Sequence, residues 1–184
     1  MKALLLPALF SFALAATLTA QTCREVVRDA SGRIVQTIDR QRSAGGSVQA
    51  TMRDASGRII GTATTAPNAG GSAQTNYRDA SGRLTGTAST QPTAGASSRT
   101  TYRDASGRMA GSANTRTGNG TATSTQYRDA SGRLTGSSAT SGSPSGSFTG
   151  TQRDASGRLT GSSSGSGKCQ GVTRTPVPPP GVKK

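Results

Sequence analysis

The sequence lacks the residues on which most enzyme active sites depend. It contains no histidine and no tryptophan, and only eight of its 184 residues are acidic, of which one is a glutamate, Glu25. Histidine and the carboxylates supply most proton-transfer groups and metal ligands in proteins, and a Ser-His-Asp triad cannot form without histidine. We therefore expect a protein that is not an enzyme and that carries no cofactor and no metal ion.

Large apolar residues are also scarce. Outside the first twenty residues, Leu, Ile, Val and Phe occupy 15 of 164 positions, about 9%, whereas folded domains usually contain at least ~20%. Composition alone favours a largely disordered, secreted tether, which we keep as an alternative. An ordered fold has to be argued from the pattern of the residues instead.

Residues 1–20 have the composition of a signal peptide. Lys2 precedes an apolar stretch, and small residues up to Ala20 offer a cleavage site. No later stretch is apolar enough to cross a membrane, so we expect no transmembrane segment. Cys23 lacks the small residue immediately before it that a bacterial lipoprotein signal requires. We expect an exported protein that is periplasmic or extracellular, with attachment to the envelope left open.

The rest of the chain is organised by one repeated hexapeptide, Arg-Asp-Ala-Ser-Gly-Arg. It begins at residues 28, 53, 78, 103, 128 and 153, a constant spacing of 25 residues, and such a period indicates a repeat architecture. The sequence predicts six copies over residues 21–169, joined by flexible Gly/Ser/Pro linkers such as residues 66–71 and 141–146. Residues 170–184 form a Pro-rich basic tail.

Each copy has the sequence pattern of a β-hairpin. Asp-Ala-Ser-Gly suits a type I turn, and Thr, Tyr and alternating apolar residues flank it. Two registers compete: a two-residue turn places Tyr77 and Leu84 on the same face, whereas a glycine bulge slips the pairing and separates them. We favour the first register because it pairs apolar residues, although it sets Arg78 opposite Arg83, a like-charge pair.

A single hairpin of this kind buries too little surface to fold alone. Six hairpins side by side would combine the apolar residues on both sides of each hexapeptide into a thin core. These are Val27/Ile34, Met52/Ile59, Tyr77/Leu84, Tyr102/Met109 and Tyr127/Leu134, with Gln152 replacing Tyr in the sixth copy, before Leu159. The predicted fold is all-β, with six 25-residue hairpin repeats closed into a shallow ring or barrel.

The segment Tyr-Arg-Asp-Ala-Ser-Gly-Arg-Leu-Thr-Gly-Thr-Ala, residues 77–88, resembles exported bacterial proteins of the β-flower fold, in which short hairpins radiate as petals around a symmetry axis. The resemblance covers nearly the whole chain after residue 20 and implies a shallow closed ring of hairpins with no established biochemical activity. Five petals are associated with that family, whereas this chain has six motifs. A weaker similarity is to the YD repeats of Rhs-type shells, which share a Gly-Arg-Leu step but have a shorter period.

The two cysteines, Cys23 and Cys169, bracket the array. In an exported protein this placement predicts one disulfide between them. Twelve strands in a flat, open sheet would separate the ends by more than ~50 Å, whereas a disulfide tolerates ~7 Å between Cα atoms, so this pairing requires a closed array. Unpaired thiols, or a disulfide between chains, are the alternative.

The formal net charge is +14, and the positive charge recurs with the repeat. Two arginines in each hexapeptide are the candidate anion-binding residues: Arg28, Arg33, Arg53, Arg58, Arg78, Arg83, Arg103, Arg108, Arg128, Arg133, Arg153 and Arg158. One interpretation is a solvated edge that prevents aggregation, in which the Asp of one hairpin pairs with an Arg of its neighbour. The other is a binding surface for anionic envelope polymers such as lipopolysaccharide or acidic glycans, because arginine suits phosphate and carboxylate.

These observations together predict an exported, non-catalytic structural or binding protein of the bacterial envelope. Its partner would be an anionic envelope polymer or another envelope protein. Nucleic acid is disfavoured as a ligand, because three Tyr and three Phe make a thin platform for stacking bases.

Overall fold

The computed structural model describes residues 21–118, 121–143 and 146–167. The predicted signal peptide, the predicted tail and Cys169 lie outside the described residues. The described part forms twelve strands and one short 3-10 helix, η1 (Ala69–Gly71). The strands are β1 (Gln21–Asp29), β2 (Ile34–Arg42), β3 (Val48–Asp54), β4 (Ile59–Pro67), β5 (Ala73–Asp79), β6 (Leu84–Thr93), β7 (Ser97–Asp104), β8 (Met109–Thr117), β9 (Thr123–Asp129), β10 (Leu134–Gly142), β11 (Phe148–Asp154) and β12 (Leu159–Gly167).

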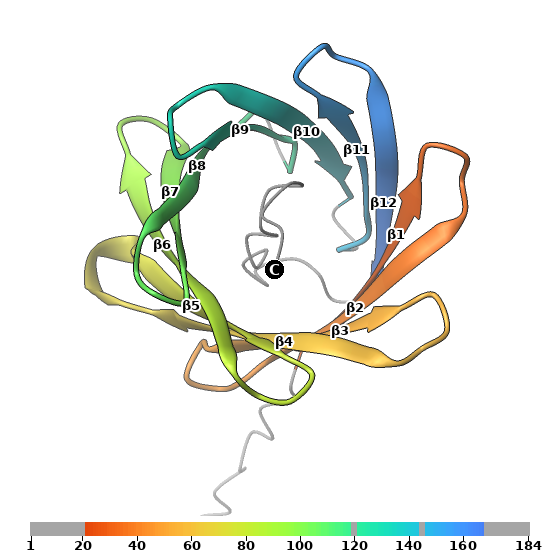
Figure 1. Ribbon diagram of the computed structural model, residues 1–184, viewed down its shortest axis with the longest axis horizontal. Coiled ribbons are helices and arrows are strands. Elements are labelled where there is room, and N and C mark those ends of the chain that lie inside the picture. The colour runs from red at the N-terminus through yellow and green to blue at the C-terminus, as the bar shows by residue number, and fades with distance from the viewer. Residues whose placement is uncertain (1–20, 119–120, 144–145, 168–184) are drawn as a thin grey trace, which may run out of the picture.

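The strands close into a barrel in which each strand is antiparallel to its neighbours in the chain (Figure 1). The first and last strands form the closing seam, where β1 pairs with β12 from Cys23 opposite Gly167 to Asp29 opposite Gly161. The prediction of an all-β fold is confirmed, and its closed form is a twelve-stranded barrel built from six hairpins. The described residues contain no helix that is long and apolar enough to cross a membrane.

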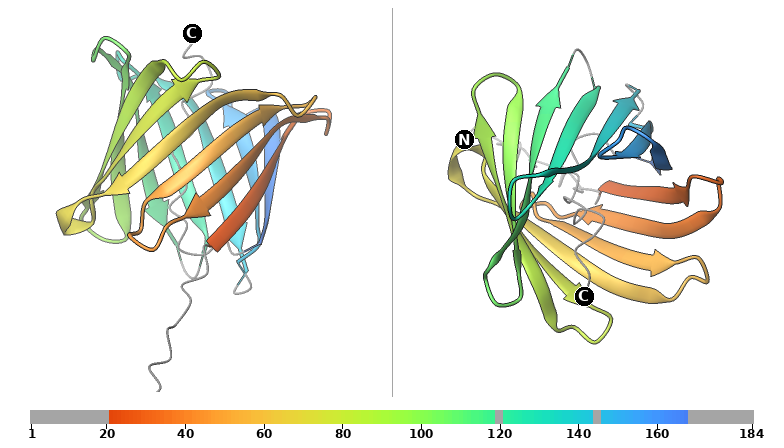
Figure 2. Two further views of the ribbon diagram at one scale, coloured as in Figure 1. Left: turned by 90° about the horizontal axis from the view of Figure 1, so that it is seen from below. Right: turned by 45° about the horizontal axis from the view of Figure 1, so that its top comes forward.

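Each hexapeptide connects an odd-numbered strand to the next even-numbered strand. Because neighbouring strands are antiparallel, the six hexapeptide turns all lie at the same end of the barrel, and the connections between hairpins lie at the other (Figure 2). We call the segment from the first Arg of the hexapeptide to the second residue after the hexapeptide a tip, and the six tips together the rim. The tips are residues 28–35, 53–60, 78–85, 103–110, 128–135 and 153–160.

The register of each hairpin differs from the one that the sequence favoured. In the third copy the Gly82 N–H donates to the Asp79 carbonyl at 3.0 Å and the Asp79 N–H donates to the Arg83 carbonyl at 3.0 Å, which is a type I turn followed by a glycine bulge. Gly82 has φ +84°, a left-handed conformation that glycine adopts at little cost. A second irregularity then pairs Tyr77 with Gly86. The prediction of a simple two-residue turn was wrong.

The barrel interior is filled by pairing large residues with small ones. Tyr77 lies between Ala63 on one neighbouring strand and Gly86 on the other, and Tyr102 lies between Ala88 and Gly111 in the same way. The main buried cluster consists of Ile38, Ala50, Ala63, Tyr77, Ala88, Tyr102 and Ala113, with Val27, Met52, Ala110 and Tyr127 packed against it. Small residues on one strand therefore make room for tyrosines on the next, and few large apolar residues suffice.

The predicted apolar core is half wrong, and the register explains why. The residue before each of the first five hexapeptides packs in the barrel, as Tyr77 does, but the residue after it does not. Leu84 is paired with Arg78 on the outer face and is 40% exposed. The same correction applies in every copy, to Ile34, Ile59, Leu84, Met109, Leu134 and Leu159, whose exposed fractions lie between 40% and 45%. The slip also removes the expected Arg78–Arg83 opposition.

Parts of the predicted linkers belong to strands. Strand β4 continues to Pro67 and strand β10 continues to Gly142. The shorter connections that remain are closed by backbone hydrogen bonds, such as the one from the Asn68 N–H to the Ser72 carbonyl at 2.8 Å. The flexibility that we expect of these linkers stays a prediction.

Candidate functional site: the rim of hairpin tips

The rim stands beyond the continuous wall of the barrel. The pairing of β4 with β5 ends at Gly61 opposite Asp79, and the pairing of β6 with β7 ends at Gly86 opposite Asp104. Residues 80–85 therefore have no partner strand outside their own hairpin. The same limit holds at the other seams, including the closing one, where Gly161 lies opposite Asp29. Beyond these last pairs, each tip projects from the wall as a loop of its own hairpin.

The glycine at each of these limits allows neighbouring hairpins to approach closely. A Cβ atom on Gly86 would lie 2.6 Å from the Arg103 carbonyl oxygen, which is closer than a real Cβ contact. Gly61, Gly111, Gly136 and Gly161 meet the next hairpin in the same way, at 2.5–2.6 Å. The first copy has Gln36 at the equivalent position, opposite Asp54. Five of the six junctions thus depend on the absence of a side chain.

The aspartate of each hexapeptide holds its own turn together. In the third copy Asp79 Oδ1 accepts hydrogen bonds from the Ser81 N–H at 2.9 Å, the Ser81 hydroxyl at 2.7 Å and the Arg83 N–H at 3.0 Å. The hydroxyl bond, followed by the backbone bonds, lowers the pKa of Asp79 below its ordinary value. The pKa values of Asp29, Asp54 and Asp154 are lowered in the same way, by hydrogen bonds from the equivalent Ser and Arg residues of their own copies. These carboxylates stabilise turns, and within the described residues none of them forms a salt bridge with a neighbouring hairpin. The expected pairing between hairpins occurs instead at Asp39, whose Oδ2 lies 3.9 Å from Arg53 Nε of the second hairpin.

The first arginine of each hexapeptide also braces its own turn. Arg78 Nη1 donates to the Gly82 carbonyl at 2.8 Å, and the equivalent bond recurs in all six copies at 2.8–3.0 Å. One of the five N–H donors of the guanidinium is used in this way. The charge of this arginine is therefore held at a defined place on the tip.

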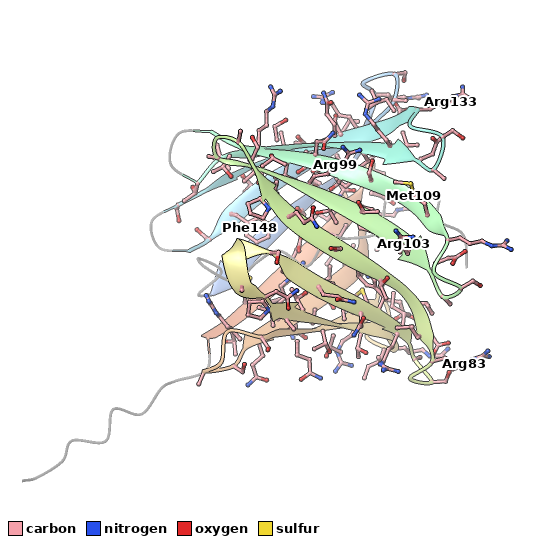
Figure 3. The ribbon with its side chains drawn as sticks, turned by 90° about the vertical axis from the view of Figure 1, so that its left-hand side faces the viewer. Arg83, Arg99, Arg103, Met109, Arg133 and Phe148 are labelled. Carbon is pink, nitrogen blue, oxygen red and sulfur yellow. The ribbon has the colours of Figure 1, made fainter. Side chains whose placement is uncertain are left out.

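The second arginine of each hexapeptide is exposed and unbraced. The side chains of Arg33, Arg58, Arg83, Arg108, Arg133 and Arg158 form no hydrogen bond or salt bridge within the part of the chain that the structure describes. Figure 3 shows Arg83 and Arg133 projecting from the same end of the barrel. All twelve predicted arginines are thus at the rim, divided into six that brace turns and six whose donors point to solvent. A guanidinium of the second kind can bind phosphate or carboxylate in a bidentate fork.

A buried ion pair in the first hairpin was not predicted from the sequence. Arg40 Nη1 lies 2.6 Å from Glu25 Oε2 inside the barrel, and the two residues are 3% and 7% exposed. Arg40 Nε has no hydrogen-bond partner among the described residues. The other five copies have no charged residues at these places, and that departure from the repeat is the signal that could have singled out the first hairpin.

The first hairpin also carries a groove that the sequence did not indicate. It has a volume of about 580 Å³ and crosses β12, β1, β2 and β3. Arg24 Nε donates to Asp39 Oδ1 at 2.7 Å on its surface, and Gln41, Gln49 and Thr51 contribute further polar side chains. This hydrogen bond lowers the pKa of Asp39.

No family model, curated protein or solved structure matches this chain. The site therefore has to be interpreted from its own chemistry. Among the described residues, no group of three or more Asp, Glu, Cys or His side chains could hold a metal ion. What the rim presents is a ring of six solvent-facing guanidinium groups on a closed β-sheet frame.

Proposed function

We propose that this chain is an exported, non-catalytic binding protein of the bacterial envelope, and that its rim binds anionic envelope polymers such as lipopolysaccharide or acidic glycans. The observation that supports the proposal is the sixfold recurrence of an exposed second arginine on a tip whose conformation is fixed by internal hydrogen bonds. A preformed loop loses little conformational entropy when it binds, and this favours affinity.

Export and the disulfide belong to the same proposal. The leader composition of residues 1–20 supports export. Cys23 is 4% exposed on β1, and its strand partner is Gly167, two residues before Cys169. This placement at the closing seam supports a Cys23–Cys169 bond that would link the two ends of the barrel. Hairpins radiating around one axis, with the motif at residues 77–88, support membership of the β-flower family (Figure 1).

The binding proposal can be tested by retention of the purified protein on immobilised lipopolysaccharide and on an immobilised acidic glycan. We expect retention at low salt that weakens as salt is raised, because counterions screen exposed charges. The variant Arg83→Gln/Arg108→Gln should elute at a lower salt concentration than the wild type.

The matched control removes the same charge away from the rim. Arg99 and Arg116 are exposed on the outer wall, and Arg99→Gln/Arg116→Gln also lowers the net charge by two. It should elute close to the wild type. Equal shifts for the two double variants would show that overall charge, and not the rim, causes retention, and would refute the proposal.

A further inference from the structure

Anionic polymers explain the arginines of the rim but not the apolar residues beside them. The second arginine is followed at once by a large apolar residue in every copy, as in Arg83-Leu84 and Arg108-Met109. The first two copies have two such residues in a row, Ile34-Val35 and Ile59-Ile60. All of these side chains are at least 36% exposed.

In the part of the chain that the structure describes, large exposed apolar side chains are confined to the rim. The eight large hydrophobic side chains that are exposed in the described part of the chain all belong to tips: Ile34, Val35, Ile59, Ile60, Leu84, Met109, Leu134 and Leu159. The outer wall between the two barrel ends carries mainly Ser, Thr, Gln, Asn and Arg, as Thr62, Asn76 and Gln126 illustrate, and its one large apolar residue in the first strand, Val26, is half-buried. A collected set of exposed apolar residues marks an interaction site, whereas scattered ones need no explanation.

The register of the hairpins keeps these apolar residues out of the barrel interior. A bulge in each hairpin turns Leu84 and its counterparts away from the interior, and the end of the inter-hairpin ladder leaves them on a projecting loop. Figure 3 shows Met109 at the same barrel end as Arg83 and Arg133. Each tip therefore combines an apolar side chain and a guanidinium at one end of the molecule.

Extending the proposed function on which it rests, we propose that the rim docks on a lipid surface with anionic phosphate headgroups. Headgroup phosphates suit the guanidinium groups, and the boundary with the acyl chains accepts apolar side chains a few ångströms below. The hexapeptides contribute twelve arginines and six aspartates, a net charge of +6 on the rim. The same charge opposes rim-to-rim association of two copies, so charge complementarity favours an anionic bilayer over a second molecule of this chain.

Cosedimentation with vesicles tests this proposal. The purified protein should sediment with vesicles of phosphatidylcholine and phosphatidylglycerol, and much less with vesicles of phosphatidylcholine alone. The double variant Leu84→Ser/Leu134→Ser should bind anionic vesicles at least ~10-fold more weakly, because each substitution removes apolar contact with the lipid. It should still be retained on the acidic glycan column, because its arginines are intact.

A fluorescent reporter gives a second readout that does not depend on weakening the binding. The chain has no tryptophan, so Met109→Trp introduces a single probe at a position that is 45% exposed. Its emission should shift to shorter wavelength when anionic vesicles are added. Asn114→Trp, on the exposed outer wall of β8, is the matched control and should not shift.

The outcomes separate this inference from the proposed function. If the leucine variant, shown to be folded by its circular dichroism melt, binds anionic vesicles as well as the wild type, or if the two tryptophan reporters respond alike, lipid docking is refuted while polymer binding stands. Binding to the glycan column without any binding to vesicles also refutes lipid docking alone. If neither is bound at low salt, the proposed function fails as well.

Discussion

At the residue scale, the hexapeptide assigns one structural task to most of its positions. In the third copy Asp79 accepts three hydrogen bonds, Gly82 takes the left-handed conformation, and Arg78 caps the Gly82 carbonyl. The turn could be predicted from Asp-Ala-Ser-Gly because these preferences are local. The task of Arg78 could not, since it depends on the bulge that brings the guanidinium over the turn.

The aspartates of the turns should make the protein sensitive to acid. In four copies the pKa of the aspartate, Asp29, Asp54, Asp79 or Asp154, is lower in the folded protein than the ordinary value of 3.8. At a pH near these pKa values, the unfolded chain therefore binds more protons than the folded protein does. Their contribution is fully present above pH 3.8 and is lost as pH falls through the folded pKa values. We expect the urea midpoint to fall between about pH 5 and pH 3.

Replacing these four aspartates with asparagine is the control for this dependence. The asparagine side chain retains an acceptor oxygen but does not titrate. The variant should show a smaller loss of stability on acidification than the wild type. An unchanged midpoint in the wild type over the same pH range would contradict the prediction.

The junction glycines yield a steric prediction. Gly86→Ala would place a methyl group 2.6 Å from the Arg103 carbonyl oxygen, so the two hairpins would have to separate. We expect a loss of about 1–3 kcal/mol in the free energy of unfolding, measured by urea denaturation. Gly45→Ala is the matched control, because a Cβ there meets nothing within 4 Å, and it should leave stability nearly unchanged. Equal effects would contradict the steric account.

At the element scale, the hairpin was predictable but its register was not. The alternation of apolar and polar residues indicated a strand on each side of every turn. Within each strand this alternation is the same in both registers, so it could not decide between them. Pairing Tyr77 with Leu84 would bury both, yet Tyr77 already fills the space left by Ala63 and Gly86. That complementarity is formed between hairpins, so no single copy of the repeat reveals it.

The observed register predicts losses of stability of very different size for the two apolar residues that flank a hexapeptide. Tyr77→Ala should lower the free energy of unfolding by about 3–5 kcal/mol, because a buried ring is lost and a cavity remains. Leu84→Ser should cost about 1 kcal/mol or less, because Leu84 is 40% exposed. Thermal and urea unfolding followed by circular dichroism measure both. A loss of stability for Leu84→Ser as large as that for Tyr77→Ala would contradict the observed register and support the one that the sequence favoured.

The first hairpin should respond strongly to loss of half its buried ion pair. Glu25→Gln leaves the Arg40 guanidinium charged and only 3% exposed, and we expect a loss of about 3–5 kcal/mol. Replacing both partners, as in Glu25→Leu/Arg40→Met, should recover most of it, since no buried charge remains. The urea midpoints of these variants measure both effects, and a double variant as unstable as the single one would contradict this account.

At the scale of the whole molecule, the closure of the array could be predicted, but the residues that fill the barrel interior could not. The constant period and the terminal placement of two cysteines both pointed to a ring. The interior depends on residues that lie 14 positions apart in the chain, as Ala63 and Tyr77 do, and on the ion pair of one exceptional copy. The candidate arginines could be named from the sequence because they belong to the repeat, whereas their division into bracing and solvent-facing groups required the turn geometry.

Closure by Cys23–Cys169 remains a prediction at this scale. The intact mass of the exported protein should be about two hydrogens below the reduced value, and reduction should lower the melting temperature without changing the monomer mass. On the loop-entropy model a cross-link over this length contributes roughly 5 kcal/mol. Free thiols in freshly isolated exported protein, or a disulfide found only between chains, would contradict it.

The six tips also have a consequence for how the molecule would respond to its surroundings. Because the tips are alike and are held on one closed frame, any ligand that binds a single tip weakly is offered six attachment points at fixed spacing. Once one tip is bound, the others meet the same surface at a high effective concentration, so overall avidity rises far above the affinity of one tip. If the rim binds anions as proposed, the molecule would respond to their surface density: it would bind scattered anions weakly and bind steeply once their spacing matches that of the tips.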